Sequence, residues 1–379
     1  MKVPFADLKI QYNQLKEKID AAIAGVIEET AFIGGRFVQE FEREFANKYG
    51  VKHVIACGNG TDSLYIIMKM LGIGVGDEVI TPANSWISSA ESITQTGAKT
   101  VFADVHPYYF SIDEEQIEKK ITNKTKAIIA VHLQGQMCNI EKIKAIADKH
   151  KLYLIEDCAQ SHFSEYKNKR AGLFGSAGSF SFYPGKNLGA YGDAGCIITN
   201  DDTIAEKCRM FARHGALVKH QHQMEGINSR MDGIQAAVLT AKLPFVEKWT
   251  EKRIAIAQSY NGYLSGIQEI ILPIVRPGTL HTFHLYVIRA KKRNELKQFL
   301  ADRGIETALH YPRILPNLPA YAYLNHNLTD FPVANLLEKE ILSLPIYPEM
   351  TDEMIRYVAD SILLFVRNNF VSVKYAGIA

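Results

Sequence analysis

The stretch KAIIAVHLQGQMCNIEKIKAIADKHKLYLIED, residues 126–157, decides the fold of this chain. It begins with the apolar run Ala127–Val131, continues through an amphipathic stretch around residues 140–150, and ends with the apolar run Tyr153–Glu156. Apolar runs of this length are typical of buried strands, and the stretch between them has the period of a helix. The order predicts two parallel strands joined by a crossover helix.

The same alternation extends in both directions along the chain. Two more strands, SFSFY (179–183) and GCIITN (195–200), lie on either side of a glycine-rich turn. We therefore expect an α/β fold with a mostly parallel central sheet. The further expected strands are His53–Cys57, Glu78–Ile80 and Thr100–Val105, and the further expected helices lie around residues 61–72, 86–97, 114–121 and 201–213.

Both ends of the chain have helical patterns. A one-faced apolar pattern predicts a helix from residue 8 to residue 26, and Phe37, Phe41, Phe45 and Tyr49 form an aromatic stripe that favours core packing. A helix should break at Pro244, and long helices mixed with strands follow. We place a domain boundary there, between a large domain (1–245) and a smaller α+β domain (246–379).

Composition excludes several classes of protein. The 379 residues carry 43 basic and 41 acidic side chains, so the net charge of +2 gives no general attraction to nucleic acid or to an anionic membrane. Five scattered cysteines without a C-x-x-C pair favour reduced thiols. The chain shows neither a secretory signal nor a run of about 18 apolar residues. We expect a cytoplasmic protein that binds neither nucleic acid nor membrane.

Lys186 is the first candidate for chemistry. It lies in the glycine-rich turn PGKNLGAYGDAG after a predicted strand, where parallel sheets usually bind their ligands. A partly desolvated lysine has a lowered pKa and attacks aldehydes or ketones as an amine. On its position alone, Lys186 is better interpreted as a solvated surface charge, as most lysines in turns are.

Asp157 is the second candidate, because it ends the strand KLYLIED at the same edge of the sheet. An isolated aspartate there is usually a helix cap or part of a turn. A carboxylate that faces a pyridinium nitrogen, together with a lysine that can form an imine, is the pair that pyridoxal phosphate requires. Together, Lys186 and Asp157 therefore indicate a pyridoxal phosphate site more strongly than either residue does alone.

A site for this cofactor also needs a phosphate-binding turn and an aromatic side chain that stacks on the ring. CGNGTDSL places Gly58 and Gly60 between a strand and a helix that starts at Thr61, whose free N–H groups can bind an anion. Trp86 could stack on a planar ring, although a core tryptophan is the alternative. The glycines of LGIGVG (71–76) lead from a helix into a strand, the reverse of a dinucleotide turn. No histidine pair has the neighbours of a metal site, so we assign no metal.

Several of these motifs together resemble the DegT/DnrJ/StrS group of sugar aminotransferases, which are fold-type I, pyridoxal-phosphate-dependent enzymes related to aspartate aminotransferase. The resemblance begins with VPFADLK at Val3 and spans nearly the whole chain. The motifs that carry it are NGTDSL (59–64), EDCAQSH (156–162), FSFYPGKNLGAYGDAG (180–195), NSRMDGIQAA (228–237) and LPIYPEM (344–350).

The resemblance implies a role for each matching residue. Lys186 would bond covalently to the cofactor, Asp157 would pair with its ring nitrogen, and Gln160 would bind its phenolic oxygen. Trp86 would cover the ring, although relatives often have Thr and Phe or Tyr where this chain has Ser85 and Trp86. The phosphate ligands would be Gly60, Thr61, Ser181 and, from the second subunit of a homodimer, Asn228. Related dehydratases carry histidine in place of Lys186, so lysine favours transamination.

The resemblance also implies the substrates. We expect L-glutamate to donate the amino group, pyridoxamine phosphate to carry it, and a nucleotide-linked ketosugar to accept it, for the biosynthesis of deoxyaminosugars found in O-antigen, lipopolysaccharide or S-layer glycans. Tyr183, His310 and Tyr311 correspond to positions that face the hexose in relatives acting at C3. Lys219, in KHQHQMEG, is a candidate for the diphosphate, with a solvated loop as the equal alternative.

The segments VPFADLK and ALHYPR favour amination at C3, and dTDP-3-keto-6-deoxyhexose is the first candidate substrate. A UDP-linked 3-ketouronic acid and a C4 ketosugar are the rivals, and no residue is an evident clamp for a uronic acid carboxylate. A cofactor-free nucleotide-binding or scaffold protein of the same fold is the alternative from another class. A nicotinamide oxidoreductase lacks its fingerprint.

Overall fold

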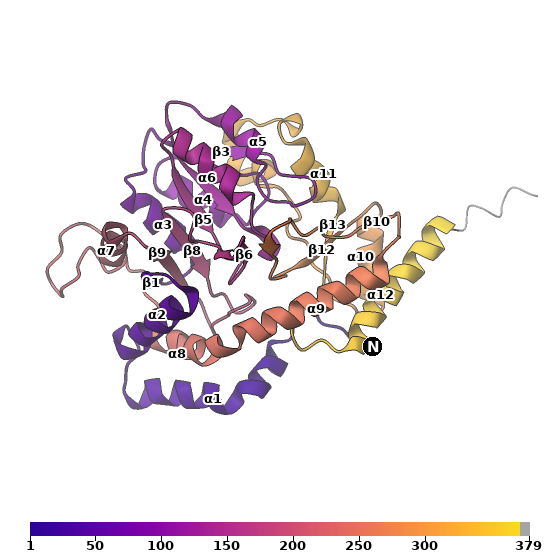
Figure 1. Cartoon of the computed structure of the whole chain (residues 1–379), viewed down its shortest axis with the longest axis horizontal. Helices are drawn as coiled ribbons and strands as arrows, with labels where there is room; N and C mark the ends of the chain where they lie inside the picture. Colours follow the sequence, from indigo (N-terminus) through magenta and orange to yellow (C-terminus); the bar gives the residue numbers. More distant parts are fainter. Residues whose placement is uncertain (372–379) are drawn as a thin grey trace, which may run out of the picture.

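The computed structural model describes residues 1–371, which form a central sheet with helices on both faces and a smaller sheet beside it (Figure 1). Within these residues the central sheet has seven strands, in the order β1-β9-β8-β5-β4-β2-β3. Their bounds are β1 His53–Cys57, β2 Glu78–Pro82, β3 Lys99–Ala103, β4 Thr125–Val131, β5 Tyr153–Asp157, β8 Ala177–Ser181 and β9 Gly195–Thr199.

The sheet is mostly parallel, as the sequence predicts, and β9 is its antiparallel member. Parallel pairing joins β3, β2, β4, β5 and β8, whereas β9 runs antiparallel to both β8 and β1. In the register, Gly195 lies opposite Cys57 on one side and Ser181 on the other. The carboxyl ends of β1 and β8 therefore flank the start of β9 at one edge of the sheet.

Helices cover both faces of this sheet, because alternate residues of each strand point to opposite faces. In β4, Ile128 and Ala130 pack in one buried cluster, and Ala127, Ile129 and Val131 pack in the other. The helices of this part of the chain are α1 Leu8–Glu28, α2 Gly35–Tyr49, α3 Gly60–Met70, α4 Ser88–Gln95, α5 Glu114–Ile117, α6 Ile140–Lys149, α7 Asp202–Phe211 and α8 Gly233–Lys242.

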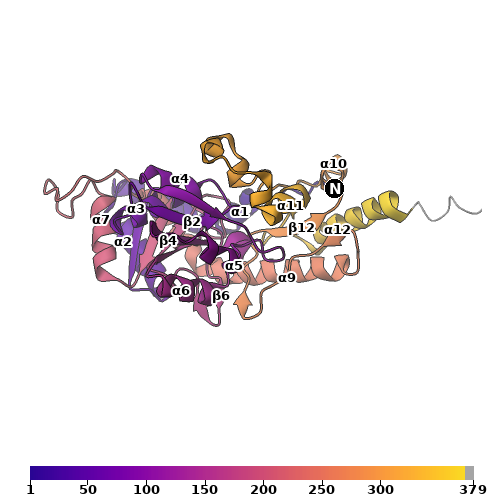
Figure 2. The same ribbon diagram turned by 90° about the horizontal axis from the view of Figure 1, so that it is seen from above.

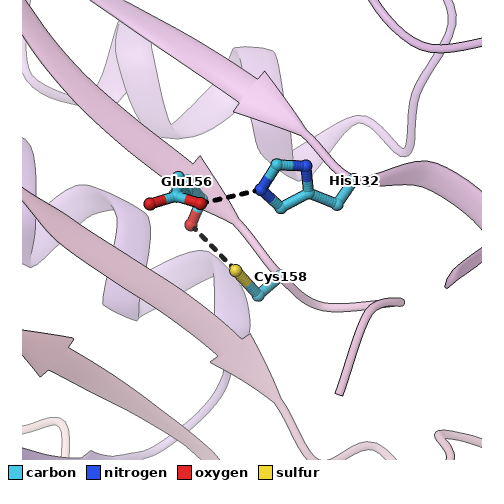
Figure 3. Close-up of side chains that lie close together, drawn as sticks. All are labelled: His132, Glu156 and Cys158. Atoms are coloured by element: carbon cyan, nitrogen blue, oxygen red, sulfur yellow. Dashed lines mark hydrogen bonds and ion pairs between the residues drawn. The ribbon is translucent and has the colours of Figure 1, made fainter. Parts of the chain in front are cut away.

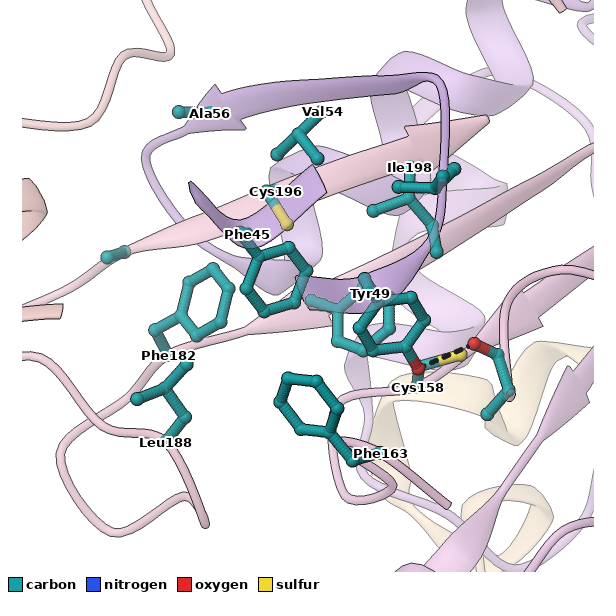
Figure 4. Packing of buried hydrophobic residues seen from close by; sticks show 14 of the residues in the cluster. Phe45, Tyr49, Val54, Ala56, Cys158, Phe163, Phe182, Leu188, Cys196 and Ile198 are labelled. Atoms are coloured by element: carbon teal, nitrogen blue, oxygen red, sulfur yellow. Dashed lines mark hydrogen bonds between the residues drawn. The ribbon is translucent and has the colours of Figure 1, made fainter. Parts of the chain in front are cut away.

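The aromatic stripe of α2 packs into the core, as predicted. The rings of Phe45 and Tyr49 stack at 5.2 Å, and Phe45 meets Phe182 edge to face at 5.6 Å (Figure 4). Each such pair contributes about 0.5–1.5 kcal/mol beyond its buried area. The hydroxyl of Tyr49 donates to the carbonyl of Ala171 at 2.7 Å. Phe182 directly follows β8, so this packing anchors the chain that leads to Lys186.

The helix break at Pro244 is a short 3₁₀ turn, Leu243–Phe245, after which α9 leads from the central sheet's side of the molecule to α12 (Figures 1 and 2). The domain boundary at residue 245 stays a prediction. β13 was not predicted. The elements that follow are α9 Val246–Leu264, β10 Ile270–Ile271, β12 Tyr286–Ala290, α10 Arg293–Asp302, α11 Pro332–Glu340, β13 Ile341–Leu344 and α12 Asp352–Val366.

The second sheet, β10-β12-β13, is antiparallel, as an α+β arrangement requires. A third, small sheet joins β11 to the hairpin of β6 and β7. The bounds of its strands are β6 Glu165–Tyr166, β7 Lys169–Arg170 and β11 Thr279–Leu280. All five cysteines are unpaired and buried, which agrees with reduced thiols. In the described part of the chain, no helix combines the length and apolar character needed to span a membrane.

Candidate active site

A cavity of about 800 Å³ opens at the carboxyl edge of the central sheet. Segments from both parts of the chain line it: loops after β1, β2, β5 and β8 on one side, and residues of α9 and of the region beyond β12 on the other. Most of the side chains predicted to form a site lie together here, namely Gly60, Thr61, Trp86, Asp157, Gln160, Ser181, Tyr183, Lys186, His310 and Tyr311.

Lys186 enters this cavity from a tight turn after β8. The turn is closed by hydrogen bonds from the Lys186 N–H to the Tyr183 carbonyl and from the Ala190 N–H to the Phe182 carbonyl, both 2.8 Å. A Cβ at Gly189 would lie 2.3 Å from the Pro184 oxygen, so glycine is required there. Burial lowers the pKa of Lys186 to about 8, and nearby Asp157 opposes this shift. A nucleophilic neutral amine is therefore accessible near neutral pH.

Asp157 ends β5 and presents its carboxylate to the same cavity. The Ala159 N–H donates to its Oδ1 at 3.1 Å, and the Ser89 hydroxyl donates to its Oδ2 at 2.9 Å. Burial raises the pKa of Asp157, whereas these two donors and Lys186 favour the ionised form. Ser85, whose hydrogen bond the sequence left uncertain, contacts the Ser89 hydroxyl at 2.8 Å. A cationic group beside Asp157 would stabilise its charge further.

The N-terminus of α3 forms an anion cradle in the cavity. The side chain of Asn59 caps the helix by accepting the Asp62 N–H at 2.8 Å, which leaves the first N–H groups of the helix, at Gly60 and Thr61, for a ligand. A Cβ at Gly60 would lie 2.8 Å from the Cβ of Ser181. The cradle therefore needs glycine at position 60, and it suits a phosphate group.

Gln160 and Trp86 also line the cavity. Gln160 accepts the Gln134 N–H at 2.7 Å and donates to the Tyr311 hydroxyl at 2.9 Å. One proton on its amide nitrogen stays available for a ligand oxygen. The indole of Trp86 is 58% exposed, with its ring 5.6 Å from the Tyr311 ring. A large uncovered aromatic surface inside a cavity favours a planar ligand over a core role.

His310 and Tyr311 line the cavity from the smaller part of the chain, and Tyr183 lies exposed beside Lys186. The Nδ1 of His310 is 2.9 Å from the Ser343 hydroxyl on β13. Burial lowers the pKa of His310 to about 4, with Lys186 adding to the effect, so its ring is neutral at pH 7. These side chains offer neutral hydrogen-bonding groups, which suit sugar hydroxyls.

Two predicted residues, Asn228 and Lys219, are not among those that line the cavity of their own chain. Asn228 pairs with Arg213 in an isolated β-bridge, and Lys219 is exposed in the segment after α7, which projects from the body of the molecule (Figure 1). The role of Asn228 toward the cofactor phosphate therefore stays a prediction that needs a second subunit, and the role of Lys219 toward the diphosphate also stays a prediction.

The sequence interpretation missed several cavity residues. One of them is His284, whose Nδ1 lies 3.2 Å from the Asn187 Oδ1, and the Asn187 amide nitrogen donates to the Thr282 carbonyl at 3.1 Å. The Asn187 Oδ1 can only accept, so the His284 proton lies on Nδ1. The two contacts also join Asn187, the residue after Lys186, to the wall of the cavity that carries His284. Arg253 also lines the cavity. Its position in the charged stretch EKRIAIAQSY carries no signal that separates it from a surface arginine.

His132, Glu156 and Cys158 form a buried cluster (Figure 3). His132 contacts the Glu156 carboxylate at 2.9 Å, and the same carboxylate accepts N–H groups of Gly172, Phe174 and Gly175 at 2.7–2.8 Å. These donors occupy the carboxylate oxygens that a metal ion would need. The cluster thus braces the loop after β7.

Comparison with known proteins agrees with this geometry. Residues 13–363 match the model of the DegT/DnrJ/EryC1/StrS aminotransferase family. A protein of Geobacillus stearothermophilus named pleiotropic regulatory protein is 45% identical over 97% of this chain and 100% of its own length. The dTDP-3-amino-3,6-dideoxy-alpha-D-galactopyranose transaminase of Aneurinibacillus thermoaerophilus is 40% identical over 95% and 98%. The crystal structure of S. venezuelae DesV with a ketimine intermediate superposes with a TM-score of 0.94, at 38% identity, over 96% and 98%.

Proposed function

Because this chain belongs to the DegT/DnrJ/EryC1/StrS aminotransferase family, we propose that it transfers an amino group from L-glutamate to C3 of a nucleotide-linked ketosugar. The enzyme is a pyridoxal-phosphate-dependent aminotransferase of nucleotide sugars, which removes the scaffold alternative. The first candidate acceptor is dTDP-3-keto-6-deoxyhexose. Support for C3 comes from His310 and Tyr311 in the cavity and from relatives named for 3-amino sugars.

One observation supports the proposal most strongly: Lys186 with its lowered pKa, the carboxylate of Asp157 and the anion cradle at Gly60 share one cavity. These groups fit pyridoxal phosphate, whose aldehyde, ring nitrogen and phosphate need an amine, an anion and a cluster of N–H donors. When bound, the cofactor supplies an electron-withdrawing ring that holds the amino group between the two half-reactions.

The chain's own side chains have separate tasks in this proposal. The amine of Lys186 would hold the cofactor at rest, and once displaced it would move a proton from the α-carbon of glutamate to the cofactor's C4′ and, in the second half-reaction, from C4′ to C3 of the sugar. Asp157 keeps the ring nitrogen protonated, and Gln160 donates to the phenolic oxygen. Trp86 covers the ring face and excludes water. Tyr183, His310 and Tyr311 orient the hexose through its hydroxyls.

Incubation of the enzyme with L-glutamate and a panel of nucleotide ketosugars tests this function. We expect 2-oxoglutarate and an amine at C3, located by NMR, with ping-pong kinetics. An amine at C4 would show that the enzyme acts on a C4 ketosugar. Faster turnover of a UDP-linked 3-ketouronic acid than of the dTDP-linked sugar would make the uronic acid the substrate. Full turnover by a Lys186→Ala variant would refute the assigned mechanism.

We also propose a homodimer in which each cavity is completed by Asn228 and Lys219 of the second subunit. The support is that neither residue lines the cavity of its own chain, although Asn228 belongs to the family motif NSRMDGIQAA. Mixed dimers of Lys186→Ala and Asn228→Ala chains offer a test, because half of the random dimers would contain one intact site. Mixing two weakly active variants should restore about one quarter of wild-type activity. No recovery after confirmed subunit exchange would contradict a shared site.

A further inference from the structure

Lys242, the last residue of α8, is a buried lysine that has no part in the proposed function. Its side chain is 1% exposed and is not among the described residues that line the cavity. Its ammonium group donates to the Gly189 carbonyl at 2.8 Å and lies 4.3 Å from the centre of the Tyr191 ring. Both partners belong to the glycine-rich turn after Lys186. Lys242 therefore contacts the segment that carries Lys186 without lining the cavity.

The charge of Lys242 is retained at a cost. Burial lowers the pKa of Lys242 to about 8 and Glu349 opposes this shift, so most of the group is a cation at pH 7. A buried cation must replace its lost water with polar partners, here a carbonyl and the face of an aromatic ring. A methionine of similar length would fill the same space without this cost. Because both partners lie on one turn, we interpret the charge as a device that holds the turn.

The Gly189 carbonyl is an effective place to hold it. The peptide unit between Gly189 and Ala190 is planar, so the carbonyl of one and the N–H of the other move together. The carbonyl accepts from Lys242, and the Ala190 N–H donates to the Phe182 carbonyl at 2.8 Å. Lys186 lies between Phe182 and this peptide unit in the sequence. Fixing the peptide unit therefore closes the loop from which the Lys186 side chain extends.

A second side chain of α8 contacts the same turn. Gln235 lies about two turns of helix before Lys242, so both residues are on one face of α8. The Gln235 Oε1 accepts the Tyr191 N–H at 2.8 Å. A Cβ at Gly192 would lie 2.8 Å from the Gln235 amide nitrogen, so the turn packs closely on this helix. The fully buried Leu239 anchors α8 in the core, which makes the helix a firm support.

We propose that Lys242 is a positioning residue for Lys186: it holds the Gly189 carbonyl and thereby directs the Lys186 amine toward the cofactor's aldehyde, with Gln235 holding the same turn at Tyr191. The inference rests on the proposed function, because it concerns attachment of the cofactor to Lys186. Attachment forms a C=N bond between the Lys186 nitrogen and the aldehyde carbon and releases water. The step therefore depends on where the amine lies.

The binding of two forms of the cofactor to the cofactor-free Lys242→Met variant tests this role. Pyridoxal phosphate can attach to Lys186, whereas pyridoxamine phosphate has an amine in place of the aldehyde and binds without attachment. We expect the dissociation constant of pyridoxal phosphate to rise about tenfold, and its attachment rate in stopped-flow absorbance to fall by a similar factor, because one charged hydrogen bond that orients the turn is lost. The affinity for pyridoxamine phosphate should stay unchanged.

A double-mutant cycle with Lys186→Ala separates positioning from general support of the site. Without the amine there is nothing to position, so in the Lys186→Ala background Lys242→Met should change the affinity for pyridoxal phosphate by less than about twofold. If Lys242→Met does not fold by circular dichroism, Gln235→Met decides, because it removes the acceptor of the Tyr191 N–H. It should show the same pattern.

Arg293→Met is the matched control. Arg293 is a buried cation, 8% exposed, that donates to the carbonyls of Ile341 and Glu338 and is not among the described residues that line the cavity. Its replacement removes a comparable set of contacts at another place in the fold. The binding of both cofactor forms should therefore match that of the wild type.

Three results would overturn the inference. In the folded variant that decides, attachment and affinity could equal those of the wild type, both cofactor forms could lose affinity equally, or the loss could persist undiminished without Lys186. Lys242 would then fill space or support the site as a whole. Failure of the proposed function looks different: no ketosugar is aminated, yet the attachment of pyridoxal phosphate to Lys186 still depends on Lys242.

Discussion

The two walls of the cavity are built in different ways. On the wall formed by the central sheet, reactive side chains come from contiguous motifs and are joined by direct hydrogen bonds, such as Ser89 to Asp157. On the opposite wall, Arg253, His284 and His310 come from separate elements and are held mainly by backbone oxygens or single side chains. From this difference we propose that the sheet wall performs the chemistry, whereas the opposite wall selects the substrate.

The largest effect in this comparison should come from Asp157 on the sheet wall. We expect Asp157→Asn to reduce kcat on the order of a hundredfold to a thousandfold, because a neutral amide no longer stabilises a protonated ring nitrogen. Single-turnover kinetics with glutamate would measure this. Asp148→Asn, on the exposed face of α6, is the control and should leave the rate unchanged. Wild-type kinetics in Asp157→Asn would remove Asp157 from the chemistry.

The anion cradle should show the next largest effect. Gly60→Ala would place a Cβ 2.8 Å from the Ser181 Cβ, so the cradle must open. The affinity for pyridoxal phosphate, measured by equilibrium titration, should fall about tenfold to a hundredfold. Gly262→Ala, on α9, meets nothing within 4 Å and serves as the control. Equal affinities in the two variants would show that the phosphate binds elsewhere.

The pH dependence of cofactor attachment distinguishes Lys186 from a solvated lysine. With a pKa of about 8 in the cofactor-free protein, about one tenth of Lys186 is neutral at pH 7 and most of it is neutral at pH 9. Since only the neutral amine attacks, covalent attachment should become about tenfold faster between these values. Stopped-flow absorbance measures the rate. A rate that keeps rising toward pH 10.5 would mean that burial does not lower the pKa of this lysine.

The smallest effect should come from a substitution on the wall opposite the central sheet. Tyr311→Phe removes the hydroxyl that accepts a hydrogen bond from Gln160 at 2.9 Å. We expect a few-fold rise in the KM for the ketosugar and little change in the glutamate half-reaction, because one neutral hydrogen bond contributes about 0.5–1.5 kcal/mol. Steady-state kinetics with each substrate varied would separate the two. If both half-reactions were lost together, Tyr311 would take part in the chemistry rather than in binding of the ketosugar.

The same contrast explains what could be predicted from the sequence. The residues of the sheet wall could be predicted because strand ends, glycine turns and helix starts are recognised from neighbouring residues in the sequence. For example, β1 has the predicted bounds His53–Cys57. Arg253 was not predictable, because its partner carbonyls at Phe283 and Ile346 are 30 and 93 residues away. β13 was missed because its short apolar run directly follows α11 and continues into the motif LPIYPEM.

Peptide mapping of borohydride-reduced holoenzyme by mass spectrometry tests the central claim most directly. Lys186 and Lys242 form a natural pair, because burial lowers the pKa of each to about 8, yet only Lys186 lines the cavity; Lys242 donates to the Gly189 carbonyl at 2.8 Å. We predict that the pyridoxyl group is found on Lys186 and is absent from Lys242. A pyridoxyl group on Lys242 or another residue, or none on the protein, would contradict the account.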